Sequence, residues 1–232
     1  MGMRFRRMAN SQSAGLGLLV TDHGMALAQI TPGLAEGDDN KHWYWQPQPL
    51  LHNGLDVAAL SQARQRSGFQ GRSLAMAIPP AQLLTYQFAS DSRLHPHQLH
   101  ASVKAQLQKV LPWPLAETVW DCQITPAVST APATQPAHRP AWLNQALQAQ
   151  PSHTIDVLAV PRAWALACED ACQQAGLQLR RLEPAWQARQ RWQTYVQQHT
   201  DVGARTGSPA EWALSEEEDA VLWGLALGAV SA

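Results

Sequence analysis

The chain has 232 residues, enough for one large domain or two small ones with a proper buried core. Its formal net charge is −1 and its 17 Lys and Arg residues are spread along the sequence, so it lacks the concentrated positive charge typical of nucleic-acid-binding proteins. Its three cysteines form an odd, sparse set, which favours a reducing compartment over a disulfide scaffold.

The first 13 residues are expected to form a flexible N-terminus. Its basic cluster MRFRRM is compatible with contact to an anionic membrane surface, but a solvated terminus is the favoured reading. No apolar segment follows the cluster, so it does not predict a secretory signal. The longest apolar run, at residues 220–232, is shorter than the about 20 residues that cross a bilayer. We therefore expect a cytoplasmic protein.

The first part of the chain predicts three strands, a helix and a fourth strand. Residues 14–31 read as a hairpin whose two apolar runs meet at a tight Asp-His-Gly turn. A third strand within 42–50 contains two prolines, which restrict it to the edge of a sheet. Apolar residues at helical spacing predict a helix over 55–67, ended by Gly68 or Gly71, and SLAMAIPP predicts a short buried strand.

The middle of the chain predicts a strand at 82–89 and a helix from about 96 to 110. That helix has one apolar face made of Leu99, Val103, Leu107 and Val110. Pro112 and Pro114 then end the helix, and a strand follows from Thr118 to Ile124. Alternation predicts that three side chains of this strand point inward: Trp120, Cys122 and Ile124. Residues 127–153 are rich in Ala, Pro, Thr and Gln and predict a long loop.

The last part predicts a buried strand in TIDVLAVP, a helix ended by Gly176, a strand in LQLRRLEP and a further helix. The first of these helices has an apolar side that includes Trp164, Ala167, Cys168 and Ala171. A polar loop at 199–210 precedes a C-terminal helix, for which Ser215 and Glu218 form a capping-box signature. Strands and helices alternate without an internal repeat, so the predicted class is α/β or α+β.

No set of residues predicts an active site or a metal site. Cys168 and Cys172 share a helix face, but a zinc site normally has four ligands and small buried core residues are the better reading. The three histidines His95, His97 and His100 have no carboxylate or cysteine near them in sequence, so a solvated helical turn is favoured. The acidic run at 215–219 complements the dipole of the helix it opens.

Phosphate-binding and nucleophile motifs are absent from the sequence as well. Gly15 and Gly17 form a GLG sequence without the third glycine and the helix of a dinucleotide loop, and there is neither a Gly-x-Ser-x-Gly elbow nor a Gly-x-x-x-x-Gly-Lys loop. We therefore predict no catalytic residue and no metal ligand.

Four segments, in order, resemble the PilM family of actin-like proteins of type IV pilus assembly and its relative HofM. They are LAMAIPPAQLLTYQF, QLQKVLPWPLAETVWDCQI, IDVLAVPRAWALACEDACQQAGLQLRRLEP and the closing AVLWGLALG. Together they span about half of the chain. The second contains the proline-tryptophan-proline turn, and the last resembles the terminal Gly-Leu-Ala-Leu helix of the family.

The resemblance implies an actin-like, ribonuclease H-like lobe with a small inserted α+β subdomain. The lobe would comprise residues 14–81 and 161–232, and the subdomain residues 82–160. The implied function is that of a non-catalytic scaffold at the cytoplasmic face of the inner membrane. Its partners would be the N-terminal cytoplasmic tail of a bitopic PilN-like protein and other proteins of the pilus assembly platform, and it would reach the membrane through that partner. The sequence does not identify the partner-binding residues.

Two departures from the family pattern argue against nucleotide binding. Members that bind ATP carry Asp-x-Gly, a Ser/Thr and a Lys in the first hairpin, whereas this hairpin has no lysine and retains only Thr21, Asp22 and Gly24 as remnant candidates. The second lobe, which would form the other wall of an ATP site, is expected to be largely missing. We therefore expect no ATP cofactor and no hydrolysis. The alternatives are a nucleotide-binding actin-like ATPase or switch, and a component of the type II secretion platform.

Overall fold

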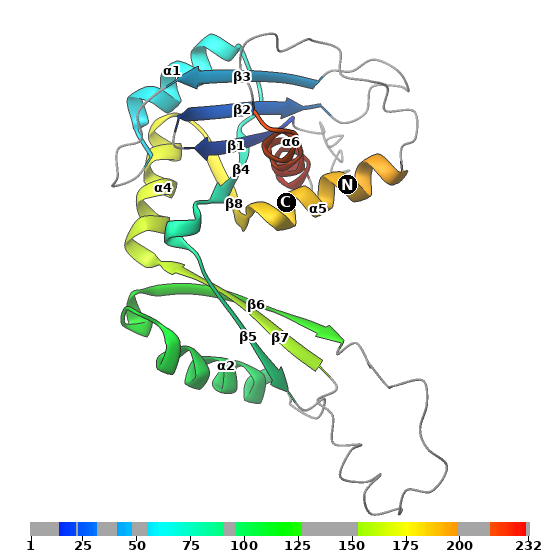
Figure 1. Cartoon of the computed structure of the whole chain (residues 1–232). Coiled ribbons are helices and arrows are strands. Elements are labelled where there is room, and N and C mark those ends of the chain that lie inside the picture. The colour runs from blue at the N-terminus through cyan, green and yellow to red at the C-terminus, as the bar shows by residue number, and fades with distance from the viewer. Residues whose placement is uncertain are drawn as a thin grey trace, which may run out of the picture. The chain divides into compact units, whose positions relative to one another are not determined.

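The computed structural model describes residues 14–21, 23–31, 41–47, 55–90, 96–126, 153–198 and 214–230. The predicted N-terminal segment 1–13 and both predicted loops, 127–153 apart from His153 and 199–210, lie outside these residues. The chain divides into two compact units, Leu83–Ala163 and the remainder (Figure 1). Leu83–Ala163 is called the inserted unit below, and the remainder is called the main unit.

The main unit is built on a five-stranded mixed sheet with the strand order β3-β2-β1-β4-β8. Its first three strands are antiparallel neighbours, while β1 pairs with β4, and β4 with β8, in parallel. The hairpin prediction is confirmed, and β3 lies at the edge as its proline requires. The strands are β1 (Gly15–Thr21), β2 (Gly24–Ile30), β3 (Lys41–Pro47), β4 (Ser73–Ile78) and β8 (Gln178–Pro184).

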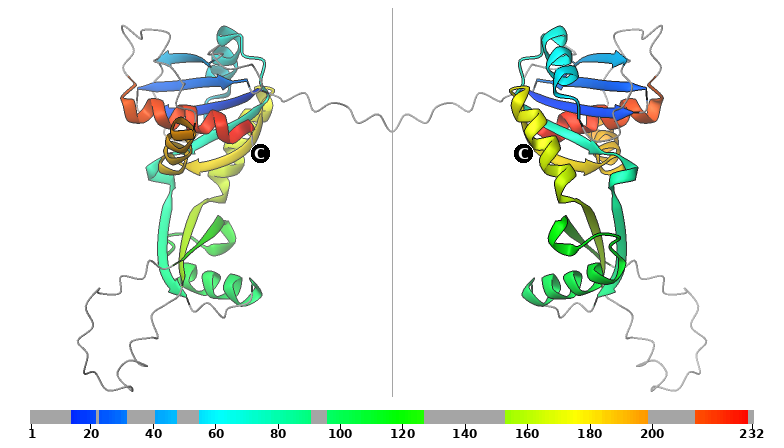
Figure 2. Two further views of the ribbon diagram at one scale, coloured as in Figure 1. Left: turned by 90° about the vertical axis from the view of Figure 1, so that its right-hand side faces the viewer. Right: turned by 90° about the vertical axis from the view of Figure 1, so that its left-hand side faces the viewer.

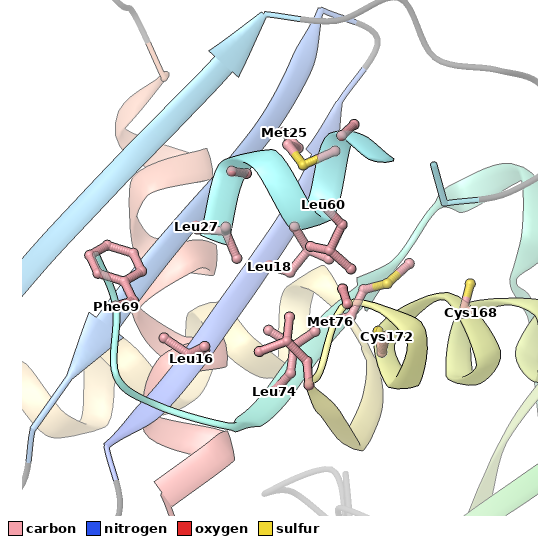
Figure 3. Close-up of a cluster of buried hydrophobic side chains, with 14 residues drawn as sticks. Leu16, Leu18, Met25, Leu27, Leu60, Phe69, Leu74, Met76, Cys168 and Cys172 are labelled. Carbon is pink, nitrogen blue, oxygen red and sulfur yellow. The ribbon is translucent and has the colours of Figure 1, made fainter. Parts of the chain in front are cut away.

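One face of this sheet is covered by α1 (Val57–Ser67) and α4 (Arg162–Gln174). Figure 3 shows the core between the sheet and these two helices, in which leucines of the strands pack against α1 and α4. Gly68 ends α1 in the left-handed conformation at φ 69°. Gly176 ends α4 in the same way, with the two backbone hydrogen bonds of a Schellman motif. The predicted apolar side of α4 is wrong for Ala167, which is exposed because it lies on the solvent side of the helix.

The other face of the sheet is covered by α6 (Glu216–Val230), on which α5 (Ala185–Gln198) packs (Figures 1 and 2). The helix approaches β1 so closely that a Cβ atom on Gly17 would lie 2.5 Å from the carbonyl oxygen of Leu222. Small residues on the strands make this approach possible, namely Gly15, Gly17, Ala26, Ala28, Ala75 and Ala77. After its acidic first turn α6 is mostly buried, which explains why this part of the helix is apolar on all sides.

The predicted capping box at the start of α6 is confirmed. The Ser215 backbone N–H donates to the Glu218 carboxylate at 2.8 Å, and the Glu218 N–H donates to the Ser215 hydroxyl at 3.2 Å. The helix therefore begins where the sequence predicts. No helix in the described part of the chain is long and apolar enough to span a membrane.

The inserted unit is a three-stranded antiparallel sheet with the order β5-β7-β6 and one helix on one face (Figure 1). Its elements are β5 (Leu84–Ser90), α2 (Pro96–Val110), β6 (Thr118–Pro126) and β7 (His153–Pro161), with a short 3-10 helix at Leu115–Glu117; another, Pro80–Gln82, ends the preceding part of the main unit. The apolar face of α2 packs on the sheet as predicted, and Trp120 and Cys122 contact the same core. Ile124 shares the face of Trp120 and Cys122, since it lies opposite the buried Ile155, but half of its side chain remains exposed.

Candidate functional site

The first hairpin turn contains two of the three remnant phosphate-site candidates. The Thr21 hydroxyl accepts a hydrogen bond from the His23 backbone N–H at 3.3 Å and donates to the Gly24 carbonyl oxygen at 3.4 Å. Thr21 and Gly24 are also register partners that close the β1–β2 ladder. Asp22 lies outside the described residues. The turn itself thus accounts for Thr21 and Gly24 without a bound phosphate.

The two cysteines of α4 lie in the core of the main unit. Cys168 and Cys172 are both fully buried among leucines and alanines of α1, β1 and β4. Burial raises the pKa of the Cys168 thiol to about 11 and that of Cys172 to about 12. Because the thiolate is the form that binds metals and attacks electrophiles, these positions are chemically inert at neutral pH. The reading of Cys168 and Cys172 as core residues is supported.

This difference in environment predicts the order of thiol alkylation. Cys122 is only partly buried, whereas the thiols of Cys168 and Cys172 are buried and keep their protons until the pH approaches 11 to 12. We expect iodoacetamide at pH 8 to modify Cys122 in the native protein and the other two only after unfolding. Mass spectrometry of peptides from native and denatured samples measures this. Rapid native modification of Cys172 would contradict the assignment.

The histidine cluster is only partly within the described residues. His100 is exposed on α2, and its ring lies 4.8 Å from the ring of Trp120 on β6. His95 and the side chain of His97 lie outside the description. Across the described ranges, the side chains of His, Cys, Asp and Glu form no group of three or more that could hold a metal ion. What the structure shows for His100 is this ring contact with Trp120.

A buried ion pair that sequence reasoning missed joins β8 to α5. Glu183 is only 2% exposed, and its carboxylate accepts two hydrogen bonds from the Arg191 guanidinium, at 2.7 and 2.5 Å. Arg191 also donates to the Gly224 carbonyl oxygen of α6 at 2.7 Å. Arg181 lies farther from the same carboxylate, at 3.9 Å. One carboxylate thus connects the last strand of the sheet to both helices that follow it.

This pair has a structural role, because its groups are satisfied by one another and by the backbone. A bidentate arginine–carboxylate pair fixes geometry as well as contributing energy. The sequence gives little indication of this ion pair. Arg191 lies eight positions after Glu183, on the other side of a proline, and this spacing predicts no contact between a strand and the helix that follows it. They meet because the chain passes directly from β8 into α5 after Pro184.

The sheet face of the inserted unit that lies opposite α2 is polar. Asp156, in the central strand, accepts hydrogen bonds from the Gln87 side-chain amide at 2.6 Å and from the Thr125 hydroxyl at 2.8 Å. These contacts connect all three strands on an exposed surface. This face therefore offers an exposed, hydrogen-bonded set of polar side chains around Asp156.

Comparison with known proteins finds structural matches but no sequence match. No protein-family model matches the sequence, and no curated protein matches it. Among solved structures, the PilM–PilN type IV pilus biogenesis complex matches with a TM-score of 0.54 and 15% identity, over 77% of this chain and 48% of that one. The cytoplasmic domain of EpsL, an inner-membrane component of the type II secretion system of Vibrio cholerae, matches with a TM-score of 0.46 and 13% identity, over 76% of this chain and 59% of that one.

The fold is therefore that of an actin-like lobe of mixed α/β class, as the sequence resemblance implied. The inserted unit enters this lobe between β4 and β8. The chain spans about half the length of the chain that it matches in the PilM–PilN structure.

Proposed function

We propose that this chain is a non-catalytic scaffold of type IV pilus assembly that binds the N-terminal cytoplasmic tail of a PilN-like inner-membrane protein. The observation that carries the proposal is the fold shared with the matched chain of a PilM–PilN complex. In this proposal the chain acts at the cytoplasmic face of the inner membrane, contacts other platform proteins there, and reaches the membrane through its partner.

The side chains that could act in catalysis are engaged in structural contacts, which supports a binding function in this proposal. The hydroxyl of Thr21 is used within its own turn, the thiols of Cys168 and Cys172 are buried and protonated, and Glu183 is paired with Arg191. Scaffolds of this kind gain affinity from pockets and main-chain pairing with an extended peptide, which needs no activated side chain.

The binding test uses the cytoplasmic tail of the PilN-like protein encoded in the same operon. A fluorescently labelled tail peptide is titrated with the full chain, and anisotropy measures binding. We expect saturable binding in the micromolar range, and no binding of a peptide with the same composition in scrambled order. No saturation with the native tail at high micromolar protein would contradict the proposal.

The alternative function is a nucleotide-binding switch, and thermal unfolding with Mg-ATP distinguishes it. A ligand that binds the folded state at 100 times its Kd stabilises it by about 2.7 kcal/mol, which raises Tm by several degrees. We expect no change in Tm with millimolar Mg-ATP, because the first hairpin lacks a lysine and its threonine is engaged. A clear rise in Tm would favour the switch.

A further inference from the structure

The helices α1 and α4 of the main unit end at the edge of the sheet where its parallel strands begin. Gly15 of β1 pairs with Ser73 of β4, and Ser73 pairs with Gln178 of β8. The two helix ends are joined there, because the Arg64 guanidinium of α1 donates to the Ala175 carbonyl oxygen after α4 at 2.7 Å. The end of α4 and the start of β1 therefore lie at the same end of the sheet (Figure 2).

Three exposed arginines lie at this end of the sheet. Arg66 is in the last turn of α1, Arg72 directly precedes β4, and Arg180 is in β8. The Arg72 carbonyl oxygen accepts a hydrogen bond from the Gln178 backbone N–H at 2.8 Å, and the Arg180 guanidinium donates to the Gln178 side chain at 2.8 Å. Arg66, Arg72 and Arg180 are called the arginine edge below.

The positive charge of the arginine edge is not neutralised within the described part of the chain. None of its three guanidinium groups forms an ion pair with a carboxylate of a described residue. The last carboxylates of α4, Glu169 and Asp170, lie at least one turn before that helix ends. The sequence between β2 and β3 also contains carboxylates, but both of those strands lie on the other side of β1 from β4 and β8.

The first residues of the chain add positive charge next to the arginine edge. Residues 1–13 contain no Asp or Glu, and they contain three arginines: Arg4, Arg6 and Arg7. This segment joins the sheet at Ala14. The Ala14 carbonyl oxygen lies against Gly71, the residue before Arg72, so closely that a Cβ atom on Gly71 would be 2.6 Å from it. The segment and the arginine edge therefore meet at one place on the main unit.

We propose that the arginine edge and the arginines of residues 1–13 bind the anionic lipid headgroups of the membrane directly. A guanidinium pairs with a phosphate through two parallel hydrogen bonds, and the anionic cytoplasmic leaflet attracts basic groups that lie close to it. In MRFRRM the arginines are interspersed with Phe and Met, whose apolar side chains suit the boundary between headgroups and acyl chains. This composition favours a bilayer over a nucleic acid.

The inference rests on the proposed function only for the location of the chain at the membrane. Lipid contact through the arginine edge does not require the PilN-like tail, and it gives the chain a second attachment beside that partner. The experiment therefore omits the tail peptide, so that its failure leaves the tail binding of the proposed function standing.

Flotation of the full chain with lipid vesicles tests the proposal. Vesicles of equal parts phosphatidylglycerol and phosphatidylcholine supply an anionic surface, and vesicles of phosphatidylcholine alone are the neutral control. We expect binding to the anionic vesicles at low salt, weaker binding as added salt screens the charges, and no binding to the neutral vesicles.

A triple variant of the arginine edge identifies the contact. Arg66→Gln with Arg72→Gln and Arg180→Gln should weaken vesicle binding by about tenfold or more, since each basic group at an anionic surface raises affinity about fivefold. Lysine at the same three positions keeps the charge and should retain most of the binding. All three side chains are exposed, so we expect the Tm of both variants to stay close to that of the wild type.

The matched control removes three exposed positive charges of the inserted unit, as Lys104→Gln with Lys109→Gln and Arg162→Gln. It lowers the net charge by the same amount and should leave vesicle binding close to that of the wild type.

A variant of the first residues tests the other part of the contact. Arg4→Gln with Arg6→Gln and Arg7→Gln changes only positions before β1 and should weaken vesicle binding as the edge variant does. A wild type that does not bind anionic vesicles at low salt overturns the proposal, and so does an edge variant that binds as well as the wild type. A control variant weakened as much as the edge variant, or tighter binding to a short DNA duplex than to anionic vesicles at the same salt, overturns it as well.

Discussion

Glu183→Ala is expected to lower the free energy of unfolding by about 3 kcal/mol, at the low end of the range for breaking a buried ion pair. The substitution leaves the Arg191 guanidinium without its carboxylate, and only 25% of the Arg191 side chain reaches solvent. The guanidinium retains its bond to the Gly224 carbonyl oxygen, which keeps the loss near the lower limit. Equilibrium unfolding in urea measures the change.

A matched control lies on the same helix. Arg189 pairs with Glu217 across the same α5–α6 contact, but both side chains are exposed, at 39% and 68%. Arg189→Ala should therefore cost less than about 1 kcal/mol. Replacing both buried charges, as Glu183→Leu with Arg191→Met, should recover most of the loss, because neither charge is then stranded. If Glu183→Ala costs no more than Arg189→Ala, the buried pair lacks the role assigned to it.

Gly224→Val should also destabilise the chain by about 3 kcal/mol, the upper end of the usual cost of overpacking. At the crossing of α5 and α6, a Cβ atom on Gly224 would overlap the backbone of Ala188, and a backbone contact does not yield as a flexible side chain does. The helices would have to separate, which also pulls Arg191 away from Gly224. Thermal or urea unfolding detects the loss.

The control for this variant is a valine in an open environment. Ala167 is exposed on α4, so Ala167→Val adds bulk without a clash and should change stability by less than about 1 kcal/mol. A Gly224→Val protein as stable as the Ala167→Val protein would show that α5 and α6 do not cross as closely as described.

Sequence patterns predicted the ends of helices and strands correctly where residues a few positions apart determine them. The first hairpin forms as predicted, Gly68 and Gly176 end their helices, and the Ser215–Glu218 capping box opens the last one. Pro112 and Pro114 ended α2 as expected. Each of these signals involves residues a few positions apart, so no knowledge of the tertiary fold was needed.

Contacts between distant segments could not be predicted in this way. Gly15 and Gly17 looked like a fragment of a dinucleotide loop, but they are small because α6, some 200 residues later, lies against β1. The pairing of Glu183 with Arg191 depends on the turn at Pro184 and on α6 closing over both. Ile124 alternates with the core-facing Trp120 and Cys122, but alternation along one strand does not show that half of its side chain stays exposed.

For the candidate phosphate site in the first hairpin, the sequence likewise indicated the positions but not the contacts. The family resemblance gave Thr21, Asp22 and Gly24 as remnant candidates of a phosphate site, and the structure shows the hydrogen bonds that engage the threonine within its own turn.

We propose that this chain binds a PilN-like tail without using a nucleotide. Isothermal titration of the tail peptide into nucleotide-free protein, repeated in the presence of Mg-ATP, tests it most directly. We expect saturable binding with the same Kd in both titrations, and no heat when Mg-ATP alone is titrated. Absence of tail binding, or binding that requires Mg-ATP, would contradict it.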